Sequence, residues 1–187
     1  MNKLLTILLL IPLISFGQSE IDDLIEVGDA KYELEDYSGA IADYTKAIEL
    51  DPENESAYRS RGVSKSNLED YHGAIVDYTK TIELNPEYDY NYSLRGDAKS
   101  QLEDYSGAIA DYTKAIELDP ENDIYYSDRG DAKYDLEDYS GAIADYTKAI
   151  ELNPEYDYYY SDRGDAKSQL EDYSGAIADY TKAIELD

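Results

Sequence analysis

Few residues in this chain of 187 are of the kind that carries out catalysis. There is no Cys and a single His, His72, so a nucleophilic triad would have only one imidazole available as its base. His72 lies near the start of a predicted helix, which indicates an exposed surface substitution. The 43 Asp and Glu make close carboxylate pairs inevitable, but no pair stands at a unique position, as the acid and base of a glycosidase would. The sequence therefore predicts no catalytic residue.

Two other patterns could hold a ligand. Residues 51–55 and 119–123 are rich in oxygen ligands but lack the Gly-centred, twelve-residue spacing of a calcium loop, so neither a metal site nor a cofactor is predicted. Arg-Gly-Asp triplets stand at 95–97, 129–131 and 163–165. Adhesion through them would require an exposed loop. All three fall in the middle of predicted helices, where the missing side chain of Gly permits close packing.

The charge balance narrows the class of partner. Sixteen Lys and Arg stand against 43 Asp and Glu, which gives a net charge of −27. Such a surface repels nucleic acid and anionic lipid, and it attracts basic or neutral polar proteins and peptides. Acidic disordered chains are poor in aromatic residues, whereas this chain has 22 Tyr at regular intervals, so we expect it to fold.

The first 17 residues have the three features of a secretory signal: Lys3, an apolar run over 4–14, and small residues around Gly17. The apolar run is too short to span a bilayer comfortably. We therefore expect cleavage between Gly17 and Gln18, with retention of the segment as an anchor as the alternative. The mature chain, 18–187, would then have no membrane span and would be exported to the periplasm or the extracellular space.

The remainder of the sequence repeats with a period of 34 residues. The segment LEDYSGAIADYTKAIEL begins at Leu34 and recurs unchanged in three later copies, and a near-copy contains His72. A fixed period of this length is typical of a solenoid. The predicted units are 21–54, 55–88, 89–122, 123–156 and 157–187.

Each unit is predicted to form two helices, which gives an all-α fold. The second helix has its apolar residues on one face: Tyr37, Ala40, Ile41, Tyr44, Ala47 and Ile48. A Glu-Asp pair after Leu68 and its equivalents forms the predicted turn between the helices, and Asp36 or Ser38 caps the second helix. Neither helix is long enough to be stable alone, so each apolar face must be buried against a neighbouring unit.

The unit resembles the tetratricopeptide repeat. That family has an aromatic residue and a Gly in the first helix, an aromatic residue before the second helix, an Ala-aromatic-Ala pattern within it, and a closing Pro. The third unit has Tyr92, Gly96, Tyr105, Ala108, Tyr112, Ala115 and Pro120 at these positions. The first unit departs from the pattern, with Leu24 at its first aromatic position. The resemblance implies a right-handed superhelical solenoid of antiparallel helix pairs that acts as a non-catalytic scaffold for protein–protein interaction.

One departure from the family pattern is systematic. Arg stands before the first-helix Gly where the family usually has Leu, at Arg61, Arg95, Arg129 and Arg163, and Val27 replaces it in the first unit. A buried charge needs a partner. We expect each Arg to pair with the Asp of the preceding unit: Asp43 with Arg61, Asp77 with Arg95, Asp111 with Arg129, and Asp145 with Arg163. Asp179 would then be free. The alternative is that these Arg side chains extend to solvent.

In the tetratricopeptide family the first helices line a concave groove that receives a partner segment. By that resemblance, four columns of residues face the groove. They are Asp29, Val63, Asp97, Asp131 and Asp165; Ile25, Arg59, Ser93, Ser127 and Ser161; Tyr32, Ser66, Ser100, Tyr134 and Ser168; and Glu33, Asn67, Gln101, Asp135 and Gln169. The groove is expected to be acidic and rich in hydroxyl groups, with Tyr32 and Tyr134 as anchors, and to bind a basic or neutral polar segment.

Two further surfaces differ from the repeating pattern. The tyrosines at the unit junctions, namely Tyr88, Tyr90, Tyr156, Tyr158 and Tyr159, could form a ledge for a peptide or glycan, or could simply cover the seam between units. The last unit has no polar capping helix after it, although solenoids usually need one. Its second helix, 173–186, could therefore dock another copy, which would make the protein a self-associating structural element of the cell envelope.

Overall fold

The structure is a computed structural model of the chain, and it describes residues 19–187. The predicted signal sequence and its cleavage position lie outside this part. Residues 19–187 form helices joined by short turns, without a strand, which confirms the predicted all-α fold. They belong to two compact units, one that ends at Asn85 and one that spans Pro86–Asp187.

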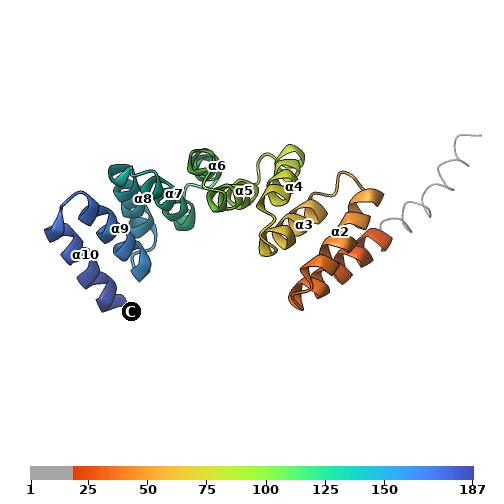
Figure 1. Cartoon of the computed structure of the whole chain (residues 1–187), viewed down its shortest axis with the longest axis horizontal. Helices are drawn as coiled ribbons and strands as arrows, with labels where there is room; N and C mark the ends of the chain where they lie inside the picture. The colour runs from red at the N-terminus through yellow and green to blue at the C-terminus, as the bar shows by residue number, and fades with distance from the viewer. Residues whose placement is uncertain (1–18) are drawn as a thin grey trace, which may run out of the picture. The chain divides into compact units, whose positions relative to one another are not determined.

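The helices of both units come in pairs (Figure 1). In the unit that ends at Asn85, residues 19–33 are helical and are followed by α2 (Tyr37–Leu50), α3 (Glu55–Asn67) and α4 (Tyr71–Leu84). The second unit contains α5 (Asp89–Gln101), α6 (Tyr105–Leu118), α7 (Asp123–Asp135), α8 (Tyr139–Leu152), α9 (Asp157–Gln169) and α10 (Tyr173–Leu186). The odd-numbered helices are the predicted first helices of the repeats, and the even-numbered helices are the second.

A tight turn joins the two helices of each pair. In the second repeat, Leu68 closes α3, and the backbone N–H groups of Glu69 and Asp70 donate to carbonyls in the last turn of that helix. Glu69 has a φ of 61°, in the left-handed region, as do its four equivalents. Asp70 caps α4 by accepting a hydrogen bond from the Gly73 N–H at 3.0 Å. The predicted Glu-Asp turn is confirmed, and of the two caps predicted for α2, Asp36 is the one used.

The packing within a pair depends on a contact between one Tyr and one Gly. Tyr146 of α8 is 2% exposed, and an added Cβ on Gly130 of α7 would come within 2.8 Å of its ring. Every repeat has this contact, which confirms that the Gly of each Arg-Gly-Asp triplet serves helix packing. Between repeats, Ala142 and Tyr146 cluster with Ala166 of α9, so the second helix of one repeat shares its core with the first helix of the next.

The arginines of the first helices are ion-paired, but in a different register from the one predicted. Arg129 donates to both carboxylate oxygens of Asp145 in its own repeat, from Nε at 2.9 Å and from Nη2 at 2.7 Å. Asp145 is 5% exposed and also accepts a hydrogen bond from Lys133 at 2.6 Å. The remaining guanidinium nitrogen of Arg129 donates to the Thr113 hydroxyl of the preceding repeat at 3.1 Å.

The predicted pairs Asp43–Arg61, Asp77–Arg95, Asp111–Arg129 and Asp145–Arg163 are therefore wrong. The pairs in the structure are Arg61–Asp77, Arg95–Asp111, Arg129–Asp145 and Arg163–Asp179. Asp43 pairs with Lys31 and Lys46 instead, and Asp179, predicted to be free, is paired. The physical reason is the Tyr–Gly contact, which brings the two helices of one repeat so close that the Asp of the same repeat reaches the guanidinium. The preceding repeat offers a Thr hydroxyl at this level.

Candidate functional site

The first of the four predicted groove columns, which contains Asp29, Val63, Asp97, Asp131 and Asp165, is held in place by the core tyrosines. The Oδ1 atoms of its four Asp residues lie 2.7–2.8 Å from tyrosine hydroxyls of their own repeats, in the pairs Asp29–Tyr44, Asp97–Tyr112, Asp131–Tyr146 and Asp165–Tyr180. In the second repeat, half-buried Val63 takes the column position, and the Tyr78 hydroxyl lies 3.2 Å from Ser66 instead. Each tyrosine occupies one carboxylate oxygen and leaves the Asp side chain exposed, so the column is both oriented and open to a ligand.

The two predicted anchor tyrosines contact the fourth column of the neighbouring repeat. Asn67 donates a hydrogen bond to the Tyr32 hydroxyl at 3.2 Å, and Gln169 donates to the Tyr134 hydroxyl at 3.2 Å. The Tyr134 ring also makes an edge contact with Tyr139, with the ring centroids 5.2 Å apart. Within each of the two compact units, the third and fourth columns therefore meet along the first-helix face.

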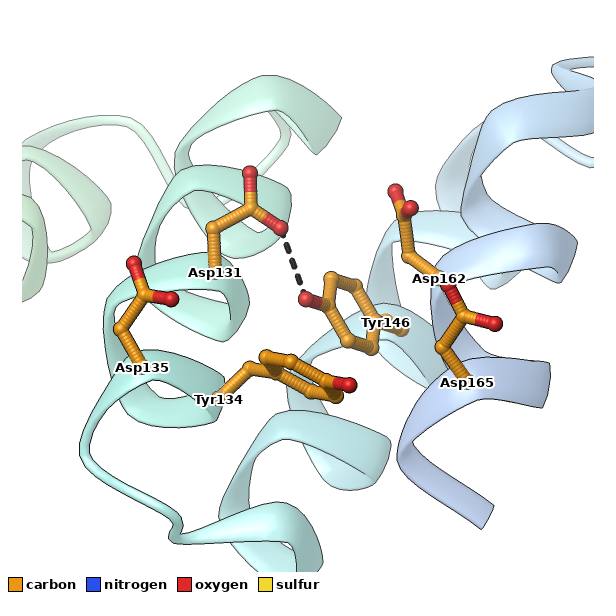
Figure 2. Close-up of a pocket in the computed structure, with 6 residues that line it drawn as sticks. All are labelled: Asp131, Tyr134, Asp135, Tyr146, Asp162 and Asp165. Carbon is orange, nitrogen blue, oxygen red and sulfur yellow. Dashed lines mark hydrogen bonds between the residues drawn. The ribbon is translucent and has the colours of Figure 1, made fainter. Parts of the chain in front are cut away.

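A pocket of about 300 Å³ opens on this face between α7 and α9. It is lined by Asp131, Tyr134, Asp135, Tyr146, Asp162 and Asp165. Figure 2 shows Asp131 and Asp135 on one side of the pocket and Asp162 and Asp165 on the other, with the two tyrosine rings between them. Four carboxylates thus face one small volume, and no Lys or Arg lines it.

The electrostatic field of this pocket raises the pKa of a carboxyl that lines it. Burial, together with the negative charges of Asp131 and Asp165, raises the pKa of Asp162 to about 7. Desolvation and like charges both disfavour the ionised form of an acid. A cation placed in the pocket would reverse the second effect, because it would interact favourably with every carboxylate there.

Several residues predicted to line the groove are not free to do so. Ser93 and Ser127 are 5% and 8% exposed, so they belong to the packed interface rather than to an open hydroxyl surface. Arg59 forms an ion pair with Glu55 of its own helix. Ser161 is half-buried, whereas Gln101 is exposed as expected. The acidic character of the groove therefore comes from the Asp columns, and the expected hydroxyl-rich character is reduced.

Two acidic residues of this face were missed in the sequence. Asp128 and Asp162 occupy one position of the first helix, which is Glu26, Ser60 and Leu94 in the earlier repeats. Because this position does not recur, it did not join any column inferred from the family. The variation itself was the available signal, since binding residues are expected where copies of a repeat differ.

The junction tyrosines divide between the two roles considered for them. Tyr159 is 3% exposed and donates a hydrogen bond to Asp123 at 2.7 Å, so it covers the seam between α7 and α9. Tyr156 and Tyr158 are 44% and 61% exposed, with ring centroids 5.5 Å apart. Tyr156 lines a second pocket between the same two helices.

Two structural features bear on other classes of function. Among residues 19–187, no helix has the length and apolar character needed to cross a membrane. Within the same residues, no group of three or more His, Asp or Glu side chains has an arrangement that could hold a metal ion.

Comparison with known proteins identifies the family. The sequence profile described as TPR repeat matches residues 28–68, 96–136 and 130–171, and one described as tetratricopeptide repeat matches 158–187. The chain is a tetratricopeptide repeat protein. No curated protein matches its sequence.

Solved tetratricopeptide structures have the same fold. A crystal structure of the MamA protein is 24% identical with a TM-score of 0.85, and covers 90% of this chain and 92% of its own. MamA from Desulfovibrio magneticus RS-1 is 19% identical with a TM-score of 0.85, over 89% of this chain and 94% of its own. YrrB, described as a TPR protein with an unusual peptide-binding site, is 20% identical with a TM-score of 0.79, over 94% of this chain and 91% of its own. The predicted helix-pair solenoid is therefore confirmed.

Proposed function

We propose that this tetratricopeptide repeat protein is a non-catalytic scaffold that binds a basic or neutral polar segment of a partner protein on the acidic face of its first helices. The pocket between α7 and α9 carries this proposal, because four carboxylates converge there without a neutralising cation. The description of YrrB as a peptide-binding protein of the same fold supports a peptide as the ligand.

The chemistry of the face favours a ligand that donates hydrogen bonds. Ionised Asp side chains only accept hydrogen bonds, and the oxygen of Asp131 nearest to Tyr146 is already occupied. The remaining oxygens suit backbone N–H groups, Lys and Arg, whereas an acidic segment would be repelled. The net charge of −27 would also speed the approach of a basic partner at low ionic strength.

The test is a crosslinked pull-down in which the mature chain serves as bait at low and high salt. A second bait carries Asp131→Asn, Asp162→Asn and Asp165→Asn, which keep the size of each side chain. The proposal expects the first bait to enrich proteins with basic segments, and the second bait to lose them.

A control bait separates the acidic face from total charge. It carries three Gln substitutions on the second helices, at Glu117, Glu151 and Glu185, which are 61%, 60% and 63% exposed and pair with a Lys three residues away. Its formal net charge, with every carboxyl counted as ionised, changes by the same amount as that of the groove variant. If both variants retrieve the same partners as the wild type with equal salt sensitivity, the proposal is wrong.

The second candidate function is self-association through α10. The residues of α10 are identical to those of α2, yet Ile184 is 78% exposed whereas its equivalent Ile48 is 8% exposed. Tyr173 and Ile177 of α10 are also 60% and 65% exposed. A further copy would cover this apolar surface, as α3 covers part of α2. Light scattering across a range of concentrations should show a rising mass that Ile177→Ser and Ile184→Ser abolish; a constant monomer mass would rule this candidate out.

We also propose that the protein acts outside the cytoplasm, on the basis of the signal-like residues 1–17. The mature protein should then begin at Gln18 when it is recovered from an exporting cell. Amino-terminal sequencing would show the intact Met1 terminus instead if the segment is kept.

A further inference from the structure

The pocket lined by Tyr156 lies toward the beginning of α7 and has a volume of about 410 Å³. Asp123, Ile124, Ser127 and Asp128 of α7 form one side. Asn153 and Tyr156 of the following link and Tyr159 of α9 complete the lining. Asp131, Tyr134 and Asp135 continue the same helix into the acidic pocket of Figure 2. The two pockets therefore follow each other along α7.

The two carboxylates of this pocket differ in what they bind. The Oδ2 atom of Asp123 accepts hydrogen bonds from the Tyr159 hydroxyl at 2.7 Å and from Asn153 at 2.9 Å, so Asp123 serves to join the repeats. Asp128 has no hydrogen-bond or ion-pair partner among residues 19–187, and it is half-buried. Asp128 is thus the one carboxylate of the pocket that lacks a partner there.

The groups that surround Asp128 offer it no positive charge. Asp97 of α5 and Asp131 of α7 interact with it unfavourably, and burial adds to their effect, so that the pKa of Asp128 is raised to about 8. The hydroxyls of Tyr112 in α6 and Tyr159 in α9 also interact electrostatically with Asp128. Burial raises the pKa of both tyrosines, so both hydroxyls are uncharged at neutral pH. None of the seven residues that line the pocket is Lys or Arg.

The remaining walls suit an aliphatic chain. Ile124 and Tyr156 are 54% and 44% exposed although they line a concavity. The Tyr156 ring is held by an edge contact with the Tyr159 ring, with the centroids 4.7 Å apart and the planes at 66°. Long cationic side chains place their alkyl part on apolar surface and their charge against a carboxylate or an aromatic ring. An apolar wall next to one unpaired carboxylate matches this division.

This combination of residues occurs once among the repeats. In the preceding repeat, Leu94 stands at the position of Asp128, and Asn122 stands at the position of Tyr156. The structural part of the junction does recur, since Tyr125 donates to Asp89 at 2.6 Å just as Tyr159 donates to Asp123. The Tyr–Asp hydrogen bond that joins adjacent repeats is thus the same at both junctions, whereas the residues at the positions of Asp128 and Tyr156 differ between them. That difference points to a ligand rather than to packing.

We propose that the pocket formed by Asp128, Ile124 and Tyr156 is a subsite for one Lys or Arg side chain of the bound segment. The cationic group pairs with Asp128, and the alkyl chain lies against Ile124 and the Tyr156 ring. This proposal rests on the proposed function and adds a defined position for one basic residue. It differs from the acidic pocket of Figure 2, where four carboxylates surround two tyrosine rings and no aliphatic side chain lines the space.

The test uses NMR with the mature chain and a short probe, so that it does not depend on knowing the partner. The probe is an acetylated and amidated Gly-Lys-Gly peptide, with Gly-Arg-Gly as a second probe and Gly-norleucine-Gly as the neutral control. A single cationic side chain is expected to bind with a dissociation constant of about 1 mM or weaker. The amide signals of residues 123–128 and 153–159 should shift with both cationic probes and much less with norleucine.

Two variants take their residues from the preceding repeat, so each introduces a side chain that this fold already accommodates. Asp128→Leu should weaken binding of the lysine probe by about tenfold or more, because a charge-assisted pair is lost. Tyr156→Asn should weaken it by about threefold or more, because the ring face is lost. Asp128→Asn replaces Asp128→Leu if the latter alters the amide spectrum beyond the pocket. Asp162→Asn, at the same position of the next repeat, should leave the shifts of residues 123–128 in place.

The affinity for the lysine probe should also rise between about pH 6 and pH 9, because a carboxyl with a raised pKa must ionise to pair with the cation. In the Asp128→Asn variant this rise should disappear. If the lysine probe shifts only the residues around Asp131, Asp162 and Asp165, the subsite is wrong while the proposed function stands. If the lysine and norleucine probes give equal shifts at the pocket, or if neither binds, the subsite is overturned as well. The proposed function is judged separately by the pull-down.

Discussion

The ion pair between Arg129 and Asp145 should be the most costly polar contact to break in the α7–α8 pair. The carboxylate of Asp145 accepts three short hydrogen bonds, two from Arg129 and one from Lys133. The change Asp145→Asn removes its negative charge and replaces one of the two accepting oxygens by an NH2 group, which cannot accept from either cation. The Arg129 and Lys133 side chains are only 17% and 21% exposed, so neither cation can be fully hydrated without rearrangement. Removing one partner of a fully buried pair costs about 3–5 kcal/mol. Because both cations have partial access to water here, we expect a loss of about 2–4 kcal/mol.

Native-state hydrogen exchange of the α7 and α8 amides is the suitable assay, because repeat arrays can open locally and hydrogen exchange reports the stability of this helix pair by itself. The control is Glu151→Gln in α8, which makes the same change of charge. Glu151 is 60% exposed and pairs with Lys148 at 3.1 Å, so its loss should cost less than about 0.5 kcal/mol. Equal protection of these amides in both variants would show that the buried ion pair does not stabilise the repeat.

Three further predictions concern the turn, the helix contact and pH. Glu69→Gly should raise the urea midpoint by relieving the left-handed φ of 61°, for a gain of about 0.5–1 kcal/mol, and an unchanged midpoint would argue against strain there. Gly130→Ala should lower stability by about 1–3 kcal/mol, because its Cβ would stand 2.8 Å from the Tyr146 ring; a stabilised variant would show that helix propensity dominates. The raised pKa of Asp128, about 8, means that the folded state keeps a proton that the unfolded chain releases near a pKa of about 4. Stability should therefore fall as pH rises from about 5 to 9, and Asp128→Asn should flatten this fall, measured by urea unfolding at each pH. The same slope in both proteins would contradict the assignment to Asp128.

The sequence was sufficient for those features that are local and recur in every copy. The period of 34 residues and the apolar face of Tyr37–Ile48 predicted the helix pairs, and the Glu-Asp turn followed from two residues that recur with the same period. The role of Gly130 was also predictable, since a Gly in the middle of a helix is unfavourable unless close packing requires it. Each of these conclusions depends on contacts between residues close in sequence.

The partner of Arg129 could not be predicted in the same way. Helical spacing shows which face a residue occupies, but it does not show whether Arg129 pairs with Asp111 of the preceding repeat or with Asp145 of its own repeat. The choice between them depends on the distance between helices, which is set by Tyr146 lying against Gly130. A periodic pattern contains no information on that distance, so the predicted register was wrong even though the need for an ion pair was right.

The candidate site was predicted in part for a related reason. Of the residues in the family columns, Asp131, Tyr134 and Asp165 line one pocket in the structure. The columns left out Asp128 and Asp162, which belong to a position that varies between copies, and they included Ser127, which is nearly buried. A column inherited from a family gives the average direction of a side chain, whereas burial depends on the particular neighbours of each repeat.

The acidic face of the first helices is proposed to select a basic segment. The most direct test is fluorescence anisotropy with three labelled peptides of one length that differ only in carrying Lys, Gln or Glu at the same positions. The wild-type chain should bind the Lys peptide most tightly and the Glu peptide most weakly. High salt should reduce the difference in affinity between these two peptides, because it screens the charges. The variant with Asn at Asp131, Asp162 and Asp165 should lose most of this preference, while the variant with Gln at Glu117, Glu151 and Glu185 should keep it. A Glu peptide that binds as tightly as the Lys peptide, or a preference for the Lys peptide that both variants keep equally, would show that the acidic face does not select a basic segment.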